Sequence, residues 1–219
     1  TWFSNKERIG GTKHVNIEKI KLLEPDLIIA NKEENVKEQI EALQEIAPVW
    51  VSDVNNFEDA LKMIKSIGEL VAKEMQAGKL IAAIETAFSK LQVTKYKIQI
   101  AYLIWRDPYM TVGGDTFIND ILRKCGLQNV FENEKRYPAI TLETIKERGT
   151  KLILLSSEPY PFKEKHLEEI KLQIPDAKVL MVDGEMFSWY GSRMLFAAQY
   201  FSELINHIYL PDSDYSNLA

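Results

Sequence analysis

Short apolar runs alternate with longer amphipathic stretches along most of the chain. Five runs are apolar almost throughout and end in polar or turn residues, which predicts strands at Leu27–Ala30, Val49–Ser52, Ile98–Ile104, Leu152–Leu155 and Val179–Val182. Continuous runs of this kind are typical of parallel strands that are covered on both faces. The stretches between them carry apolar residues at helical spacing, and helices are predicted at Asn35–Ile46, Phe57–Val71, Gln76–Leu91, Thr116–Cys125, Thr141–Arg148, Phe162–Leu172 and Gly191–Ile208. Strands that alternate with helices predict an α/β fold.

Two of these helices, Phe57–Val71 and Gln76–Leu91, follow one another with no strand between them. Because this interrupts the alternation near the middle of the chain, we predict a domain connection there. The predicted parts are an N-terminal lobe at 1–74, a linker helix at 75–95 and a C-terminal lobe at 96–219. The alternative, an αα-hairpin packed on a single lobe, stays open at this point.

One segment of the sequence occurs twice in outline. "NIEKIKLLEPDLIIANKEE" begins at Asn16, and "TLETIKERGTKLILLSSEP" begins at Thr141. Aligned without a gap, both copies predict a capped helix start, a short helix, a turn and a strand, and Glu18 stands opposite Glu143. A glutamate in the first turn of a helix is favoured by the helix dipole, which is sufficient to explain each residue alone. The alternative is that two lobes of the same build present the pair on an outer rim, where the carboxylates can dock arginines of a partner.

Aromatic and charged side chains follow the ends of the predicted strands. In open parallel sheets, ligands bind beyond the carboxyl ends of the strands. The segments at those ends are Asn31–Lys32, Trp105–Tyr109, Ser156–Tyr160 and Phe187–Tyr190. They contain Trp105 and Trp189. If these two residues lie in loops, their large rings are at the surface, where a bulky ligand would cover them. Alternatively, the aromatic loops pack back onto their own lobe.

The composition is that of a globular chain, with 46% hydrophobic residues, 27% charged residues and a formal net charge of −5. The acidic balance and the lack of a basic stretch argue against a nucleic-acid-binding protein. The single Cys125 excludes an intramolecular disulfide and is predicted to be a small core residue. No nucleophile elbow, phosphate-binding glycine loop or metal-ligand spacing is present, and His14, His166 and His207 are predicted to be surface or capping residues. We therefore predict no catalytic residue, no metal ligand and no enzymatic activity.

Four stretches carry a resemblance to a known family: "NIEKIKLLEPDLIIA", "YLIWRDPYMTVGGDTFINDILRKCGLQNVF", "RYPAITLETIKERGTKLILLSSEP" and "VDGEMFSWYGSRMLFAAQYFSELI". They resemble the substrate-binding proteins of ABC importers for cobalamin, haem and ferric siderophores, over about Gly10–Ile208. The resemblance implies two Rossmann-like lobes joined by a long backbone helix. It also implies that an iron or cobalt chelate is held between the lobes and that there is no resident cofactor.

The resemblance also implies roles for single residues. Glu18 and Glu143 match the family's two rim glutamates, which engage arginines of the membrane permease dimer. Together with the strand-end pattern, the resemblance makes the following residues candidate ligand contacts: Asn31, Trp105, Arg106, Tyr109, Tyr137, Glu158, Trp189 and Tyr190. Asn31 stands where cobalamin binders have a tryptophan, so that contact is expected to be missing or replaced.

The family's first strand, helix and strand have no counterpart before the segment that begins at Thr1, so we expect a truncated N-terminal lobe. The open strand edge of such a lobe would expose unpaired backbone groups, which can pair with a second copy of the chain. The resemblance implies a periplasmic or lipid-anchored extracytoplasmic location. No signal peptide is seen in the printed sequence, which keeps open a cytoplasmic location and, with it, a cytosolic α/β protein or enzyme that handles a metal tetrapyrrole. A purely structural interaction domain is the third hypothesis.

Overall fold

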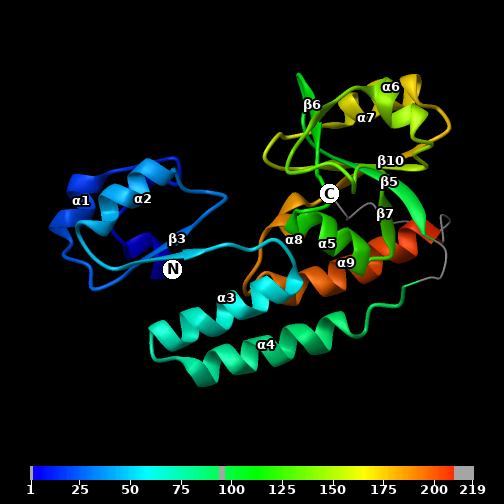
Figure 1. Cartoon of the computed structure of the whole chain (residues 1–219). Helices are drawn as coiled ribbons and strands as arrows, with labels where there is room; N and C mark the ends of the chain where they lie inside the picture. The colour runs from blue at the N-terminus through cyan, green and yellow to red at the C-terminus, as the bar shows by residue number, and fades with distance from the viewer. Residues whose placement is uncertain (1, 94–96, 210–219) are drawn as a thin grey trace. The chain divides into compact units, whose positions relative to one another are not determined.

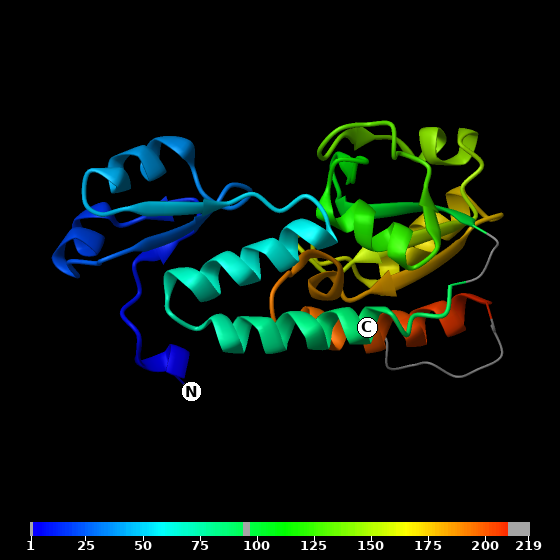
Figure 2. The same ribbon diagram turned by 60° about the horizontal axis from the view of Figure 1, so that its bottom comes forward.

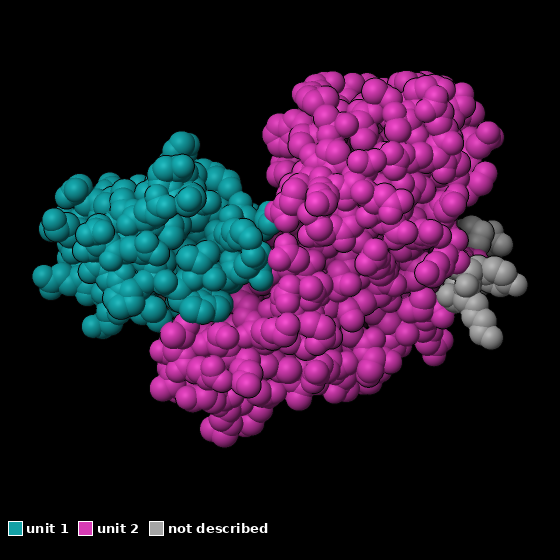
Figure 3. Space-filling model, in the orientation of Figure 1, with its two compact units in different colours: residues 1–53 teal, residues 54–219 magenta. Residues whose placement is uncertain are grey.

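The computed structural model of the protein describes residues 2–93 and 97–209 (Figure 1). The chain forms two compact units, Thr1–Asp53 and Val54–Ala219, which are coloured separately in Figure 3. Each unit contains parallel strands connected by helices, which confirms the predicted α/β fold class. Among the described residues, no helix combines the length and the apolar character that crossing a bilayer requires.

The first unit is built on two parallel strands that a helix connects. Its elements are η1 (Trp2–Asn5), β1 (Gly10–Gly11), β2 (His14–Val15), α1 (Ile17–Leu22), β3 (Ile28–Asn31), α2 (Lys37–Gln44) and β4 (Val49–Ser52). Both predicted strands are confirmed, and in their register Asn31 lies opposite Ser52. The unit's small core contains Ile20 of α1, Ala30 of β3 and Leu43 of α2.

The second unit contains a mixed sheet with the strand order β10-β9-β5-β6-β8, in which β7 also pairs with β5. The strands are β5 (Ile98–Trp105), β6 (Tyr109–Thr111), β7 (Leu127–Asn129), β8 (Ala139–Ile140), β9 (Leu152–Ser156) and β10 (Lys178–Val182). Strands β10, β9, β5 and β7 are parallel, whereas β6 and β8 are antiparallel to their neighbours. The three longer strands were predicted from sequence, and their carboxyl ends lie at one edge of the sheet.

Helices cover both faces of this sheet (Figure 2). They are α3 (Phe57–Leu70), α4 (Glu74–Phe88), α5 (Phe117–Lys124), α6 (Leu142–Glu147), α7 (Glu164–Gln173), α8 (Gly184–Ser188) and α9 (Met194–Tyr209). Side chains alternate across β5, so that Tyr102 packs into the core cluster of α3, α4, α5, α8 and α9, while Leu103 packs into that of α6 and α7. Both faces are therefore buried, as the continuous apolar runs predict.

Helices α3 and α4 form the αα-hairpin that the sequence left open as an alternative. They pack on each other, and α4 also packs on α9 (Figure 2). A Cβ added to Gly68 of α3 would lie 2.5 Å from the Cβ of Ala77 of α4, so the two helices approach closely at this glycine. By compactness, both helices group with the second unit, whereas the sequence placed the first of them in the N-terminal lobe.

The duplicated sequence corresponds to a duplicated structure. The order helix, strand, helix, parallel strand occurs as α1-β3-α2-β4 in the first unit and as α6-β9-α7-β10 in the second. Asn16 Oδ1 accepts from the backbone N–H of Lys19 at 2.9 Å, and Thr141 Oγ1 accepts from that of Thr144 at 3.1 Å. Both predicted caps are thus confirmed, and Glu18 and Glu143 take the same place in the first turn of their helices.

Candidate functional site

Three segments converge at the edge of the second unit where β5, β9 and β10 end, which we call the carboxyl edge. The loop after β9 lies between the other two. Within it, the backbone N–H of Ser157 donates to Val182 O at 3.0 Å, and that of Tyr160 donates to Ile104 O at 3.3 Å. The central loop is therefore tied to the ends of both neighbouring strands.

Glu158 connects this central loop to the C-terminal end of α8, the helix that follows β10. Its Oε1 accepts hydrogen bonds from Ser188 Oγ at 2.5 Å and from Trp189 Nε1 at 2.9 Å. Its backbone carbonyl accepts from Ser156 Oγ at 2.6 Å, and Ser156 in turn accepts from the Tyr102 hydroxyl at 3.1 Å. Burial raises the pKa of Tyr102, so this hydroxyl stays protonated and can act as the donor. A chain of hydrogen bonds thus runs from the sheet interior to the exposed indole.

Gly184, the first residue of α8, is required by this packing. A Cβ at this position would lie 2.3 Å from Ser156 Oγ and 2.6 Å from Glu158 Cγ. The close approach lets the backbone N–H of Gly184 donate to Ser157 Oγ at 3.0 Å. A larger residue would displace the central loop.

Trp105 and Arg106 lie on the other side of the central loop. The sequence places Trp105 in a loop, but in the structure it is the last residue of β5 and pairs with Met110 of β6, and Arg106 follows it. The Trp105 ring meets Tyr160 edge-on at 5.6 Å between centroids, and Trp105 remains 40% exposed. Arg106 Nη2 pairs with Glu169 Oε2 of α7 at 2.9 Å. Hydrogen bonding to Tyr109 and Tyr160 raises the pKa of the guanidinium further, so Arg106 is a fixed cation beside an exposed aromatic ring.

The second exposed ring lies directly after α8, the helix that follows β10. Trp189 is 52% exposed, and the guanidinium carbon of Arg193 lies 5.8 Å from its ring centroid. Arg193 also forms an ion pair with Glu185 of α8. The sequence places Phe187 in a loop beyond the last strand, but the structure buries it in α8 against Tyr102.

Two predicted contact residues are partly engaged in packing on their own unit. The Tyr190 ring meets Phe117 edge-on at 5.3 Å, and Tyr137 is half-buried with Arg136 over its ring at 5.4 Å. The predicted residues that the structure links through the central loop are Trp105, Arg106, Tyr109, Glu158 and Trp189.

The remaining predicted contact, Asn31, belongs to the first unit, where its side chain holds a turn. Its Oδ1 accepts from the backbone N–H groups of Glu33 and Glu34 at 2.9 and 3.1 Å, and its Nδ2 donates to Ser52 Oγ at 3.0 Å. This arrangement gives Asn31 a structural role at the end of β3. A ligand contact by Asn31 stays a prediction.

The two glutamates predicted to dock a partner are both exposed. Glu18 stands in the first turn of α1 and Glu143 in the first turn of α6. Within the described residues, neither carboxylate takes part in a hydrogen bond or an ion pair of the chain. Both are therefore available to an external cation, and docking stays a prediction.

The other residues with reactive or metal-binding side chains have packing or capping roles. Cys125 is buried, and desolvation raises the pKa of its thiol. His166 is buried and caps α7, since its Nδ1 accepts from the backbone N–H of Lys163 at 3.0 Å, in agreement with the predicted capping role. The described ranges hold no group of three or more His, Cys, Asp or Glu side chains placed to bind a metal ion.

Comparisons with known proteins agree on one family. Residues 4–175 match the sequence pattern of the family described as periplasmic binding protein. The vitamin B12-binding protein of Vibrio parahaemolyticus is 25% identical over 155 residues, which are 68% of this chain and 56% of that protein. This chain therefore spans little more than half the length of that relative.

Solved structures share the fold. The periplasmic haem-binding protein HutB of Vibrio cholerae superimposes with a TM-score of 0.75 at 19% identity, over 94% of this chain and 86% of that one. An ABC transporter substrate-binding protein from Listeria monocytogenes EGD-e gives a TM-score of 0.75 at 19% identity, over 93% and 85%. All three proteins bear the names of binding proteins, which does not favour the alternative of a cytosolic enzyme.

Proposed function

This chain belongs to the periplasmic binding protein family, and from this premise we propose that it is the substrate-binding component of an ABC importer. The cargo that we propose is an iron or cobalt chelate, such as a ferric siderophore, haem or cobalamin. In this role the chain binds and delivers its cargo without catalysing a reaction. The proposed location is extracytoplasmic, as the family's description implies.

The observation that carries the proposal is the pair of exposed indoles at the carboxyl edge. Trp105, at the end of β5, and Trp189, directly after α8, are 40% and 52% exposed, although ring packing and a hydrogen bond hold them in place. Large aromatic rings contribute most to the free energy of folding or binding when they are covered. They also stack readily on flat or bulky organic groups. The organic part of a chelate has this character.

Charge adds a second element of recognition. Arg106 and Arg193 stand beside Trp105 and Trp189, and each is held by a carboxylate from a neighbouring helix. Guanidinium groups bind carboxylates through paired, charge-assisted hydrogen bonds. We therefore propose that ring stacking and arginine contacts together hold an anionic chelate, while the metal ion keeps the ligands of its chelator.

The proposed partner is the permease of the importer, which would contact Glu18 and Glu143. Their equivalent places in α1 and α6 and their lack of a partner in the described residues support this assignment. Pairing of the β3-β4 sheet with a second copy of the chain stays a prediction, motivated by the two-stranded sheet of the first unit.

The experiment that tests the proposal is a titration of the full chain with haemin, cyanocobalamin and a ferric siderophore in turn. Bound cargo is separated from free cargo by equilibrium dialysis and measured by its absorbance. We expect saturable one-to-one binding of one of the three, and weaker binding of the same siderophore or porphyrin without metal. Binding of none of them would overturn the proposed cargo.

A further inference from the structure

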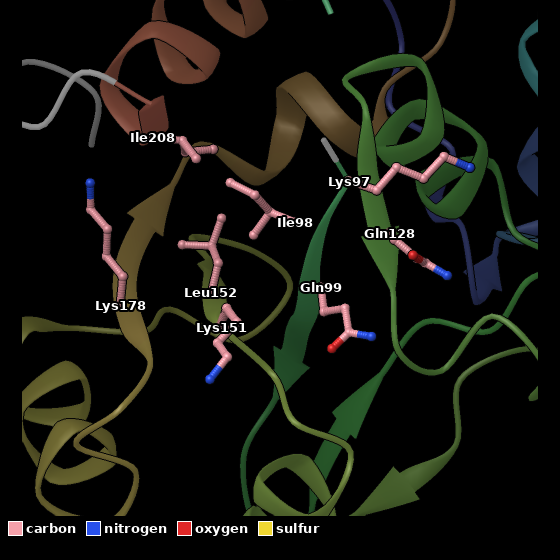
Figure 4. A pocket seen from close by; sticks show the side chains of 8 residues that line it. All are labelled: Lys97, Ile98, Gln99, Gln128, Lys151, Leu152, Lys178 and Ile208. Atoms are coloured by element: carbon pink, nitrogen blue, oxygen red, sulfur yellow. The ribbon is translucent and has the colours of Figure 1, made fainter. Parts of the chain in front are cut away.

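The second unit has a pocket of about 430 Å³ at the edge of its sheet where the parallel strands begin (Figure 4). Its three lysines are Lys97, Lys151 and Lys178, and Figure 4 shows their side chains pointing away from one another. Lys178 Nζ donates to the carbonyl oxygen of His207 at 3.0 Å. These charges therefore do not converge on one site. Polar side chains do converge elsewhere in the second unit, around the glycine turn at 112–114.

Each carbonyl group of the glycine turn accepts a hydrogen bond from a side chain. The pairs are Val112 O with Asn129 Nδ2 at 2.8 Å, Gly113 O with Thr116 Oγ1 at 2.8 Å, and Gly114 O with Asn119 Nδ2 at 3.2 Å. Asn129 Nδ2 also donates to Asn119 Oδ1 at 3.0 Å, which links the two asparagines. All three donor residues are buried, and a buried polar group that loses its partner costs stability. The turn is therefore fixed from the side of α5 and β7, which carry Asn119 and Asn129.

The N–H groups of the turn bind a second segment, at 132–138, which we call the strap. The bonds are Gly113 N to Arg136 O at 2.6 Å, Gly114 N to Glu134 O at 2.9 Å and, just before the turn, Thr111 N to Pro138 O at 3.1 Å. A Cβ on Gly113 would lie 2.5 Å from Glu134 O. One on Gly114 would overlap the carbonyl oxygen of Glu132, so this close approach requires glycine at both positions. The turn thus connects the buried asparagines to the strap.

The strap carries Arg136 and Tyr137. Arg136 has a φ of 55°, in the left-handed region that residues with a side chain rarely adopt. Its backbone N–H donates to Asp115 Oδ1 at 2.6 Å and its carbonyl accepts from Gly113, so the surroundings hold it in this conformation. Strained backbone of this kind is frequent at ligand sites. Tyr137 follows directly, and its half-buried ring packs on the core cluster of α3, α4, α5, α8 and α9. The backbone on both sides of this ring is therefore fixed by the turn.

We propose that Thr116, Asn119 and Asn129 are positioning residues for cargo binding. Through the glycine turn they fix the strap, and the strap holds the ring of Tyr137 in the orientation that meets the cargo. This role rests on the proposed function, because it requires that the predicted contact Tyr137 meets the cargo. The three side chains are buried, so they act through Tyr137 and do not touch the cargo themselves.

The first measurement needs no cargo and uses the full chain with 3-fluorotyrosine in place of Tyr137. Thr116→Val removes both hydrogen bonds of the hydroxyl at nearly constant volume, and we expect the fluorine resonance at position 137 to shift or broaden. Thr116→Ser keeps the hydroxyl and should keep the wild-type resonance. A second label in place of Tyr160, in the central loop, is the control and should respond to neither change. An unchanged resonance at position 137 in Thr116→Val would overturn the proposal.

The second measurement is equilibrium dialysis with haemin, cyanocobalamin and a ferric siderophore. Thr116→Val and Asn119→Ala should each weaken binding about two- to tenfold, the range for one aromatic contact. Tyr137→Leu should weaken it by a similar factor. Adding either change to Tyr137→Leu should weaken binding no further, because the ring that they position is gone. Gly68→Ala, which disturbs the packing of α3 on α4, controls for lower stability and should keep the affinity.

The outcomes separate this role from the proposed function. If Thr116→Val and Asn119→Ala weaken binding by the same factor with and without the ring of Tyr137, they act by another route and the proposal is overturned. A loss of affinity in Gly68→Ala as large as in Thr116→Val would also overturn it. If the wild type binds none of the three compounds while the resonance at position 137 responds as expected, the proposed cargo is wrong and the positioning of Tyr137 is supported.

Discussion

Trp189 Nε1 donates a hydrogen bond to Oε1 of Glu158 at 2.9 Å, and Ser188 Oγ donates to the same oxygen at 2.5 Å. The indole is therefore oriented by the loop after β9, although it follows β10 in the chain. Because Glu158 is itself linked through Ser156 to the buried Tyr102, the sheet determines where this exposed ring points.

Replacing Glu158 tests this link. Glu158→Ala leaves Ser188 and Trp189 without their shared acceptor, and we expect the free energy of unfolding to fall by about 1–2 kcal/mol. Cargo affinity should fall as well, because the ring loses its fixed orientation. Glu158→Gln keeps an acceptor oxygen and should lose less in both respects. Urea unfolding and equilibrium dialysis measure the two quantities, with Glu168→Ala, an exposed glutamate of α7, as the control.

The close packing of α3 on α4 is tested by two glycines. A Cβ on Gly68 would lie 2.5 Å from the Cβ of Ala77, whereas one on Gly78 would meet no atom within 4 Å. We expect Gly68→Ala to lower the free energy of unfolding by about 1–3 kcal/mol. Gly78→Ala should raise it by about 0.5–1 kcal/mol, because alanine favours the helix. Equal effects of the two changes would contradict the hairpin packing.

His166 makes the stability of the second unit depend on pH. Desolvation lowers the pKa of His166, and the nearby Arg106 acts in the same direction. As the pH falls below the ordinary value of about 6.5, the unfolded state therefore takes up the proton first. The stabilising contribution is complete above that pH and is lost as the pH falls towards the lower pKa of the folded state. Protonation would also remove the Nδ1 acceptor that caps α7.

The corresponding measurement is urea unfolding at pH 7 and pH 5. We expect the loss of stability on acidification to be smaller in His166→Gln than in the wild type. His14→Gln, at an exposed histidine of β2, is the control and should keep the wild-type dependence. If the wild type and both variants lose the same stability between pH 7 and pH 5, His166 does not have this role.

If Glu18 and Glu143 dock the permease, replacing them should lower transport without changing cargo binding. Glu18→Ala combined with Glu143→Ala should lower import by the reconstituted transporter at least tenfold, with cargo affinity unchanged. The loss of the two helix-dipole contacts should cost only about 0.3–1 kcal/mol of stability for each residue. Glu147→Ala, an exposed glutamate at the other end of α6, should leave import unchanged. Normal import by the double variant would contradict docking through these residues.

The sequence predicts those parts of the fold that depend on local pattern. Strands such as Leu152–Ser156 are recognisable because parallel strands buried on both faces need continuous apolar runs. Strands β6, β7 and β8 were missed, because two or three residues carry no measurable period. The packing partners of α4 were also left open, since an amphipathic helix does not reveal which surface covers it.

Some residues of the candidate site could likewise be predicted from the sequence, and others could not. Trp105 and Trp189 could be placed at the carboxyl edge, because the end of a parallel strand is a position that the sequence reveals. Their supporting residues could not be found. Glu169 pairs with Arg106 across 63 residues of sequence, and Ser188 meets Glu158 across 30. Contacts of this kind arise only when the strands are in register.

The most direct test of the account is the quenching of tryptophan fluorescence by the bound chelate, which absorbs in the emission range of the indole. The variants are Trp105→Phe combined with Trp189→Phe, and Trp50→Phe as the control in the first unit. Phenylalanine keeps an aromatic ring, so each variant should still bind. We predict that most of the quenching disappears in the double variant and persists in Trp50→Phe. Full quenching in the double variant would contradict a cargo site at the carboxyl edge.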